Sequence, residues 1–137
     1  MPLILLVEDD DKDVILLTRA FERAGLKNPI QRVPSGTACV AYLNGVPPYG
    51  DRERFPMPSL VLLDIKLPEM DGFEVLRWIR AQPGFENLCV VMLTAAEEIR
   101  NANLAYQLGA DSFLVKSLDF INSEELLHTV QRLLAQC

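Results

Sequence analysis

Short runs of branched apolar residues alternate along this chain with segments whose apolar residues recur at helical spacing. Runs with few charges are typical of strands that are buried on both faces of a parallel sheet. They cover Leu3–Val7, Ile30–Val33, Leu60–Leu63, Leu88–Leu93 and Ser112–Val115. Because strands that alternate with helices form repeated βαβ units, the pattern predicts an α/β domain with a doubly wound, five-stranded parallel sheet.

The expected helices have recognisable starts and stops. Ser35 and Asp71 are suitable N-caps, and Glu74, three residues after Asp71, completes a pattern that resembles a capping box. Gly25 and Gly109 stand where two of the helices should end. The expected helices, five in all, cover Asp11–Ala24, the residues after Ser35 to about Asn44, Asp71–Arg80, Glu97–Leu108 and the residues from Ser123 onward.

One predicted loop, Val46–Pro58, is long for a compact α/β domain and holds four prolines and four charged residues. Loops of this length are often functional. A surface insertion is the simpler interpretation, since extra loop length costs little free energy. We adopt the insertion and keep a functional loop as the alternative.

Polar residues directly follow four of the predicted strands. They are Glu8 and Asp9 after the first, Asp64 after the third, Thr94 after the fourth and Lys116 after the fifth. Ligands of doubly wound sheets bind beyond these carboxyl ends, so the five side chains should converge. Three neighbouring carboxylates repel by roughly 1 to 4 kcal/mol per pair, and oxygen ligands favour a hard cation such as Mg²⁺. The set predicts a site for a metal-bound phosphoryl group, with Thr94 and Lys116 as hydrogen-bond donors.

Other polar residues have simpler interpretations. Asp10, Asp11 and Asp13 are expected to form a solvated helix start, where acids are favourable. His128 is expected to be an ordinary residue of the last helix, because no base or nucleotide-binding loop lies near it in the sequence. We assign no chemical function to these three acids or to His128.

Composition narrows the class of protein. With 137 residues and 50% hydrophobic content, the chain is expected to form a single domain over residues 1–137 with no effector domain. A net charge of −6 argues against direct nucleic-acid binding. Cys39, Cys89 and Cys137 show no metal-ligand spacing and are interpreted as reduced thiols. The sequence contains no signal peptide and no apolar segment of about 18 residues, so we expect a cytoplasmic protein without membrane contact.

Four motifs make the chain resemble the receiver domain of two-component response regulators over nearly its whole length. They are LLVEDD at 5–10, LVLLDIKLPEMDG at 60–72, VMLTA at 91–95 and LGADSFLVK at 108–116. The resemblance implies the flavodoxin-like strand order 2-1-3-4-5 and a signalling domain, not an enzyme, that assists its own phosphotransfer and dephosphorylation. Its implied site residues are Asp64 for phosphorylation, Glu8, Asp9, Asp64 and the Lys66 backbone carbonyl for Mg²⁺, and Thr94, Ala95, Lys116 and Phe113 for phosphoryl contact and switching.

The resemblance also implies partners. They are a sensor histidine kinase or a histidine phosphotransfer protein, and a downstream protein target. The loop Val46–Pro58 and the segment around Leu118, Asp119 and Phe120 resemble single-domain regulators that pair with phytochrome-type kinases. Members of that group tend to dimerise, so a homodimer is one expected assembly.

One departure from the family pattern concerns Ser117, which stands where a proline usually follows the lysine. A cis bond before serine costs about 2.5 to 4 kcal/mol, so we expect a trans or rearranged loop over Ser117–Asn122, which puts the reach of Lys116 in question. A receiver that binds partners without phosphorylation is therefore an alternative. A metal-dependent aspartyl phosphatase is less favoured, because Lys66 stands where its DxDxT motif needs an acid, and the acidic residues after the first strand argue against a flavodoxin.

Overall fold

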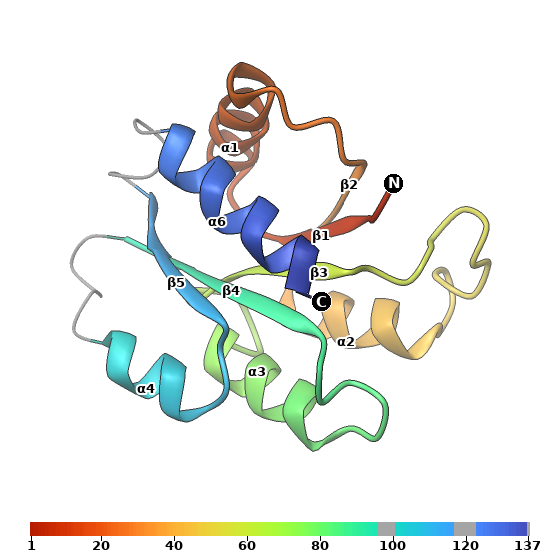
Figure 1. Cartoon of the computed structure of the whole chain (residues 1–137). Coiled ribbons are helices and arrows are strands. Elements are labelled where there is room, and N and C mark those ends of the chain that lie inside the picture. Colours follow the sequence, from red (N-terminus) through yellow and green to blue (C-terminus); the bar gives the residue numbers. More distant parts are fainter. Residues whose placement is uncertain (96–100, 117–122, 137) are drawn as a thin grey trace.

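A five-stranded parallel sheet with the order β2-β1-β3-β4-β5 forms the centre of the computed structural model (Figure 1). The structure describes residues 1–95, 101–116 and 123–136. The strands are β1 (Ile4–Val7), β2 (Ile30–Val33), β3 (Leu60–Asp64), β4 (Cys89–Thr94) and β5 (Ser112–Val115). In the described residues the helices number five, namely α1 (Asp11–Ala24), α2 (Gly36–Asn44), α3 (Gly72–Ala81), α4 (Ala102–Gln107) and α6 (Ser123–Gln136). The predicted fold class and strand order are confirmed.

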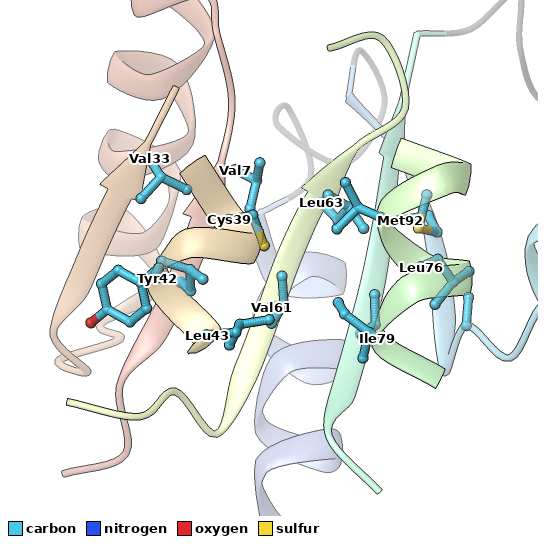
Figure 2. Packing of buried hydrophobic residues seen from close by; sticks show 14 of the residues in the cluster. Val7, Val33, Cys39, Tyr42, Leu43, Val61, Leu63, Leu76, Ile79 and Met92 are labelled. Carbon is cyan, nitrogen blue, oxygen red and sulfur yellow. The ribbon is translucent and has the colours of Figure 1, made fainter. Parts of the chain in front are cut away.

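Alternate residues of each central strand enter two separate hydrophobic cores. In β1, Leu5 and Val7 belong to the core beneath α2, α3 and α4, whereas Ile4 and Leu6 belong to the core beneath α1 and α6 (Figures 1 and 2). The period of two follows from the pleat, which points successive side chains to opposite faces. Because both faces are covered, the central strands β1, β3 and β4 are apolar up to their carboxyl ends, as the sequence pattern predicts.

Helix ends follow local sequence chemistry. The Asp71 carboxylate accepts a hydrogen bond from the Glu74 amide at 3.0 Å, and Ser35 Oγ accepts one from the Ala38 amide at 3.1 Å, which confirms both predicted N-caps. Gly25 has a φ of 82° and caps α1 in the left-handed conformation that glycine adopts readily.

Two strands run one residue further than their apolar runs, because backbone pairing continues through the first polar residue. Asp64 is therefore the last residue of β3, where it pairs in register with Leu93, and Thr94 ends β4 opposite Val115. The structure places α4 over Ala102–Gln107, and residues 97–100 of the helix predicted over Glu97–Leu108 lie outside the described part of the chain.

The loop Val46–Pro58 packs tightly against the end of α2. Arg52 donates hydrogen bonds to the carbonyl oxygens of Tyr42, Leu43 and Phe55 at 2.9 to 3.2 Å, which satisfies acceptors at a helix C-terminus. The Tyr42 ring contacts the Phe55 ring edge-on. Since the loop leads from the end of α2 to the start of β3, it lies at the amino edge of the sheet, opposite the edge where Asp64 and Thr94 end their strands.

The cysteines do not all behave as the sequence suggests. Cys39 is a free, buried thiol, as predicted. Cys89 is disulfide-bonded, so the prediction of a reduced thiol is wrong for this residue. Spacing along the chain does not reveal which elements pack together, and in the structure Cys89 Sγ lies 3.7 Å from the Leu133 carbonyl oxygen of α6. Cys137 lies outside the described residues.

Among the described residues, none of the helices has the length and hydropathy needed to cross a membrane.

Candidate functional site

Three carboxylates meet at the carboxyl edge of the sheet. β1 and β3 are neighbours with Val7 opposite Leu63, so the residues that follow, Glu8 and Asp64, emerge side by side. Each of Glu8, Asp9 and Asp64 offers a carboxylate oxygen within 4.8 Å of the others. Glu8 and Asp64 are buried, whereas Asp9 is exposed. The structure thus brings together the acids that the sequence placed at two distant strand ends.

Lys116 enters this acidic cluster from the end of β5. Its ammonium nitrogen lies 2.5 Å from Glu8 Oε1, 2.8 Å from Asp13 Oδ2 and 3.1 Å from Asp64 Oδ2. A lysine has three N–H donors, so one is available for each carboxylate. Lys116 therefore reaches the phosphoacceptor candidate, although the segment Ser117–Asn122, with its expected trans or rearranged path, lies outside the described residues.

Asp13 is a site residue that the sequence did not reveal. It was expected to belong to a solvated helix start, but its side chain is 28% exposed and pairs with Lys116, so that prediction is wrong for Asp13. The other two acids fit it better: Asp10 caps α1 by accepting from the Lys12 amide, and Asp11 is 84% exposed. The one sequence signal for Asp13 was its position about one turn beyond Glu8 and Asp9. This signal becomes informative only once Lys116, at the end of β5, is known to lie beside Asp13.

Arg32 of β2 is a second contribution that the sequence did not reveal. Its guanidinium donates from Nε to the Glu8 carbonyl oxygen at 2.8 Å and from Nη2 to the Asp9 carbonyl oxygen at 3.2 Å. Nη2 also pairs with Asp11 at 3.0 Å. The arginine therefore fixes the backbone of the two adjacent acids while leaving their carboxylates free to face the site.

The remaining predicted residues lie around this cluster in different surroundings. Thr94 is buried at the end of β4, and its Oγ1 donates to the carbonyl oxygen of Ala95 at 3.1 Å. Phe113 is half-buried and packs against the core beneath α2, α3 and α4. Lys66 is exposed, two residues beyond Asp64. Their roles in phosphoryl contact, switching and metal binding stay predictions.

Gly72 allows the chain after Asp64 to turn back against its own strand. Its amide donates to the Ile65 carbonyl oxygen at 2.8 Å. A Cβ at this position would lie 2.3 Å from the Asp64 carbonyl oxygen and 2.8 Å from Ile65 Cα, closer than real Cβ contacts. The absence of a side chain at the start of α3 thus decides where the backbone of Asp64 is held.

Burial and mutual repulsion shift the acids toward their neutral forms. Burial, with a contribution from Asp64, raises the pKa of Glu8 to about 8 despite the opposing effect of Lys116. Burial likewise raises the pKa of Asp64, again against the effect of Lys116. Burial alone would lower the pKa of Lys116, but hydrogen bonds to Asp13 and Glu8 raise it above its ordinary value. One ammonium therefore does not offset the acids, and a further cation would be stabilised here.

The raised pKa of Glu8 predicts how the stability of the metal-free chain depends on pH. Its ordinary pKa of 4.5 describes the unfolded chain, so between 4.5 and about 8 the folded chain binds more protons. This contribution is fully present below pH 4.5 and is lost as pH rises through about 8. We expect the free energy of unfolding to fall as pH rises across this range. Glu8→Gln should remove this fall, which amounts to about 1.4 kcal/mol for each unit by which the pKa is shifted.

Urea unfolding in the presence of a chelator, repeated across the pH range, measures this effect. Glu22→Gln, which changes an exposed carboxylate on α1, is the matched control and should retain the slope of the unmodified chain. An unaltered slope in Glu8→Gln would show that another group causes the pH dependence.

Comparison with known proteins yields one family. The profile described as "Response regulator receiver domain" matches residues 4–131. The chain is 37% identical over 131 residues to the probable methanogenesis regulatory protein FilR2 of Methanothrix harundinacea, covering 96% of this chain and 80% of that protein.

Solved structures of the same kind superpose closely. Response regulator RPA3017, in red light signaling of R. palustris, has a TM-score of 0.85 and 31% identity, covering 95% of this chain and 91% of the other. The bacteriophytochrome response regulator RtBRR has a TM-score of 0.83 and 34% identity, covering 97% and 78%. The Mn²⁺-bound form of response regulator Rcp1 has a TM-score of 0.79 and 29% identity, covering 96% and 92%.

Proposed function

We propose that this chain, which belongs to the response regulator receiver domain family, accepts a phosphoryl group on Asp64 from a phosphohistidine of a sensor histidine kinase. The observation that carries the proposal is the position of Asp64, which ends β3 beside Glu8 and within 3.1 Å of the Lys116 ammonium. The pocket therefore combines a nucleophilic carboxylate, a cationic donor and oxygen ligands for a metal.

The donor set fits Mg²⁺. Glu8, Asp9 and Asp64 supply only oxygen atoms, close enough together to share one ion. The exposed Lys66 would add its backbone carbonyl as a further ligand. The Mn²⁺-bound form of Rcp1 supports a divalent ion in a receiver of this shape. When bound, Mg²⁺ neutralises charge on the transferring phosphoryl group and orients it toward Asp64.

The residues of the chain account for the transfer step. A carboxylate oxygen of Asp64 attacks the phosphorus, a P–O bond forms, and the P–N bond to the histidine breaks with the electron pair going to the leaving imidazole. Positioning and charge neutralisation contribute most in phosphoryl transfer. Lys116 supplies a fixed positive charge, and Arg32 holds the backbone that presents Glu8 and Asp9.

The switch proposed for the phosphorylated state begins at Thr94. Its hydroxyl donates to the neighbouring Ala95 carbonyl oxygen, and a phosphoryl group on Asp64 would offer it a more strongly charged acceptor. Movement of Thr94 would open space for Phe113, which is half-buried at the adjacent strand β5. The chain would signal in this way as a protein-binding domain and not as an enzyme for an external substrate.

Phytochrome-type kinases are the proposed source of the phosphoryl group. The similar structures include a bacteriophytochrome response regulator and a regulator in red light signaling, which supports this choice. A histidine phosphotransfer protein, as the other partner of a relay, and a downstream protein target complete the proposal. Action as a single domain without an effector, assembly as a homodimer and a cytoplasmic location stay predictions.

Phosphoryl labelling tests this function directly. The purified chain is mixed with phosphoramidate, with Mg²⁺ or with a chelator, and weighed intact. We expect a gain of one phosphoryl group that needs the metal and is reversed by hydroxylamine, which attacks acyl phosphates. A folded chain that binds Mg²⁺ but is never labelled would contradict the proposal and favour a receiver that binds partners without phosphorylation.

A further inference from the structure

The three carboxylates that surround Lys116 are not equivalent. Glu8 and Asp64 belong to the group whose oxygens could share a metal ion, together with Asp9. Asp13 is not part of this group and comes from the first turn of α1. Its Oδ2 nevertheless lies 2.8 Å from the Lys116 ammonium, which makes it one of the two shortest contacts of that lysine.

A metal ion and the ammonium of Lys116 would compete for the same two carboxylates, those of Glu8 and Asp64. In the described structure Lys116 contacts Glu8 Oε1 and Asp64 Oδ2. A divalent ion bound by those carboxylates would withdraw their negative charge from the lysine and repel its ammonium. Without another partner, Lys116 would then be driven from the pocket at the stage when a phosphoryl group needs it.

Asp13 is placed to prevent this loss. We propose that Asp13 is a positioning residue that anchors Lys116 at the pocket when a metal ion occupies Glu8 and Asp64. The inference rests on the proposed function, because it assigns Asp13 a part in the same phosphoryl transfer. It needs no movement of α1, since the contact already exists.

A simpler role for Asp13 is that of an acid that favours a helix N-terminus. The low exposure of the Asp13 side chain argues that this role alone does not explain its position. Asp11, two residues earlier, is 84% exposed, whereas the Asp13 side chain is 28% exposed and is bonded to a lysine 103 residues away. The bond links α1 to the end of β5, and the two roles predict different mutant behaviour.

The experiment compares Asp13→Asn with Asp10→Asn. Both remove one negative charge from the same helix start, and asparagine at position 10 still caps α1. We expect Asp13→Asn to slow labelling by phosphoramidate at saturating Mg²⁺ by about tenfold, the lower range for loss of a residue that orients a ligand. Calorimetric titration with Mg²⁺ alone should show weaker binding in Asp13→Asn than in Asp10→Asn.

Variants that lack Lys116 distinguish the anchoring of this lysine by Asp13 from a general effect of the negative charge of Asp13. In Lys116→Met, adding Asp13→Asn should change Mg²⁺ affinity no more than adding Asp10→Asn does. Asp13→Glu and Asp13→Gln form a second pair of equal size, and only the charged member should retain labelling near the original rate. These two variants replace Asp13→Asn in the comparison if Asp13→Asn does not fold, as judged by thermal unfolding.

Two results would overturn the inference: equal behaviour of Asp13→Asn and Asp10→Asn, or an effect of Asp13→Asn that persists in full without Lys116. Failure of the proposed function gives a different result. In that case the unmodified chain is not labelled, while the Mg²⁺ titrations still report whether Asp13 and Lys116 act together.

Discussion

Replacing Asp64 with asparagine should abolish phosphoryl labelling while leaving the chain folded. The amide lacks the nucleophilic carboxylate oxygen, and no other acid in the cluster stands at the end of β3 beside Lys116. Because burial raises the pKa of Asp64, the fold favours a neutral group there. Asp64→Asn should therefore also stabilise the metal-free chain at pH values above the raised pKa of Asp64, where its carboxylate would be ionised.

Intact mass after incubation with phosphoramidate and Mg²⁺ measures the first effect, and urea unfolding measures the second. Asp51→Asn is the matched control, since it changes an acid of the loop Val46–Pro58 at the opposite edge of the sheet and should be labelled normally. Full labelling of Asp64→Asn would place the phosphoryl group on another residue and remove Asp64 from the mechanism.

Gly72→Ala should destabilise the fold by roughly 3 kcal/mol or more, the upper range for overpacking. Helix propensity alone predicts the opposite sign, because alanine is the better helix former and Gly72 is the first residue of α3. The added Cβ would lie 2.3 Å from the Asp64 carbonyl oxygen, and both clashing atoms belong to backbone that has little room to move. The loop beyond Asp64 would have to shift, so labelling should slow as well.

Urea unfolding of Gly72→Ala beside Gly50→Ala provides the comparison. A Cβ on Gly50 would lie 3.3 Å from the Gly45 carbonyl oxygen, so that exchange should cost far less. Equal stability of the two variants would mean that the contact at Gly72 relaxes without cost and does not fix the position of Asp64.

Local patterns were sufficient for the elements of this fold. Apolar runs with few charges predicted the strands, and residues such as Ser35, Asp71 and Gly25 predicted where helices begin and end, because caps depend on neighbours within one turn. The limits of strands were less accurate: Asp64 and Thr94 continue β3 and β4 beyond the apolar runs. Backbone pairing with an adjacent strand sets those limits, and a single strand's sequence does not contain that information.

The candidate site likewise contains residues that the sequence predicted and residues that it did not. Glu8, Asp9, Asp64, Thr94 and Lys116 were predictable because each stands at or just beyond the end of an apolar run, and parallel strands bring their carboxyl ends to one edge. Asp13 and Arg32 were not predictable. Each contributes through a partner far away in the sequence, Lys116 for Asp13 and the Glu8 carbonyl oxygen for Arg32.

The sequence by itself determined the succession of strands and helices along the chain and the chemistry available at one edge of the sheet, since both follow from short-range pattern. Only the tertiary structure decided which charges meet. It assigned Asp13 to Lys116, Arg32 to the backbone of the acid pair and Gly72 to the space beside Asp64. Ion pairs and close backbone contacts depend on distances of a few ångströms between segments that the chain order leaves unrelated, and packing alone sets those distances.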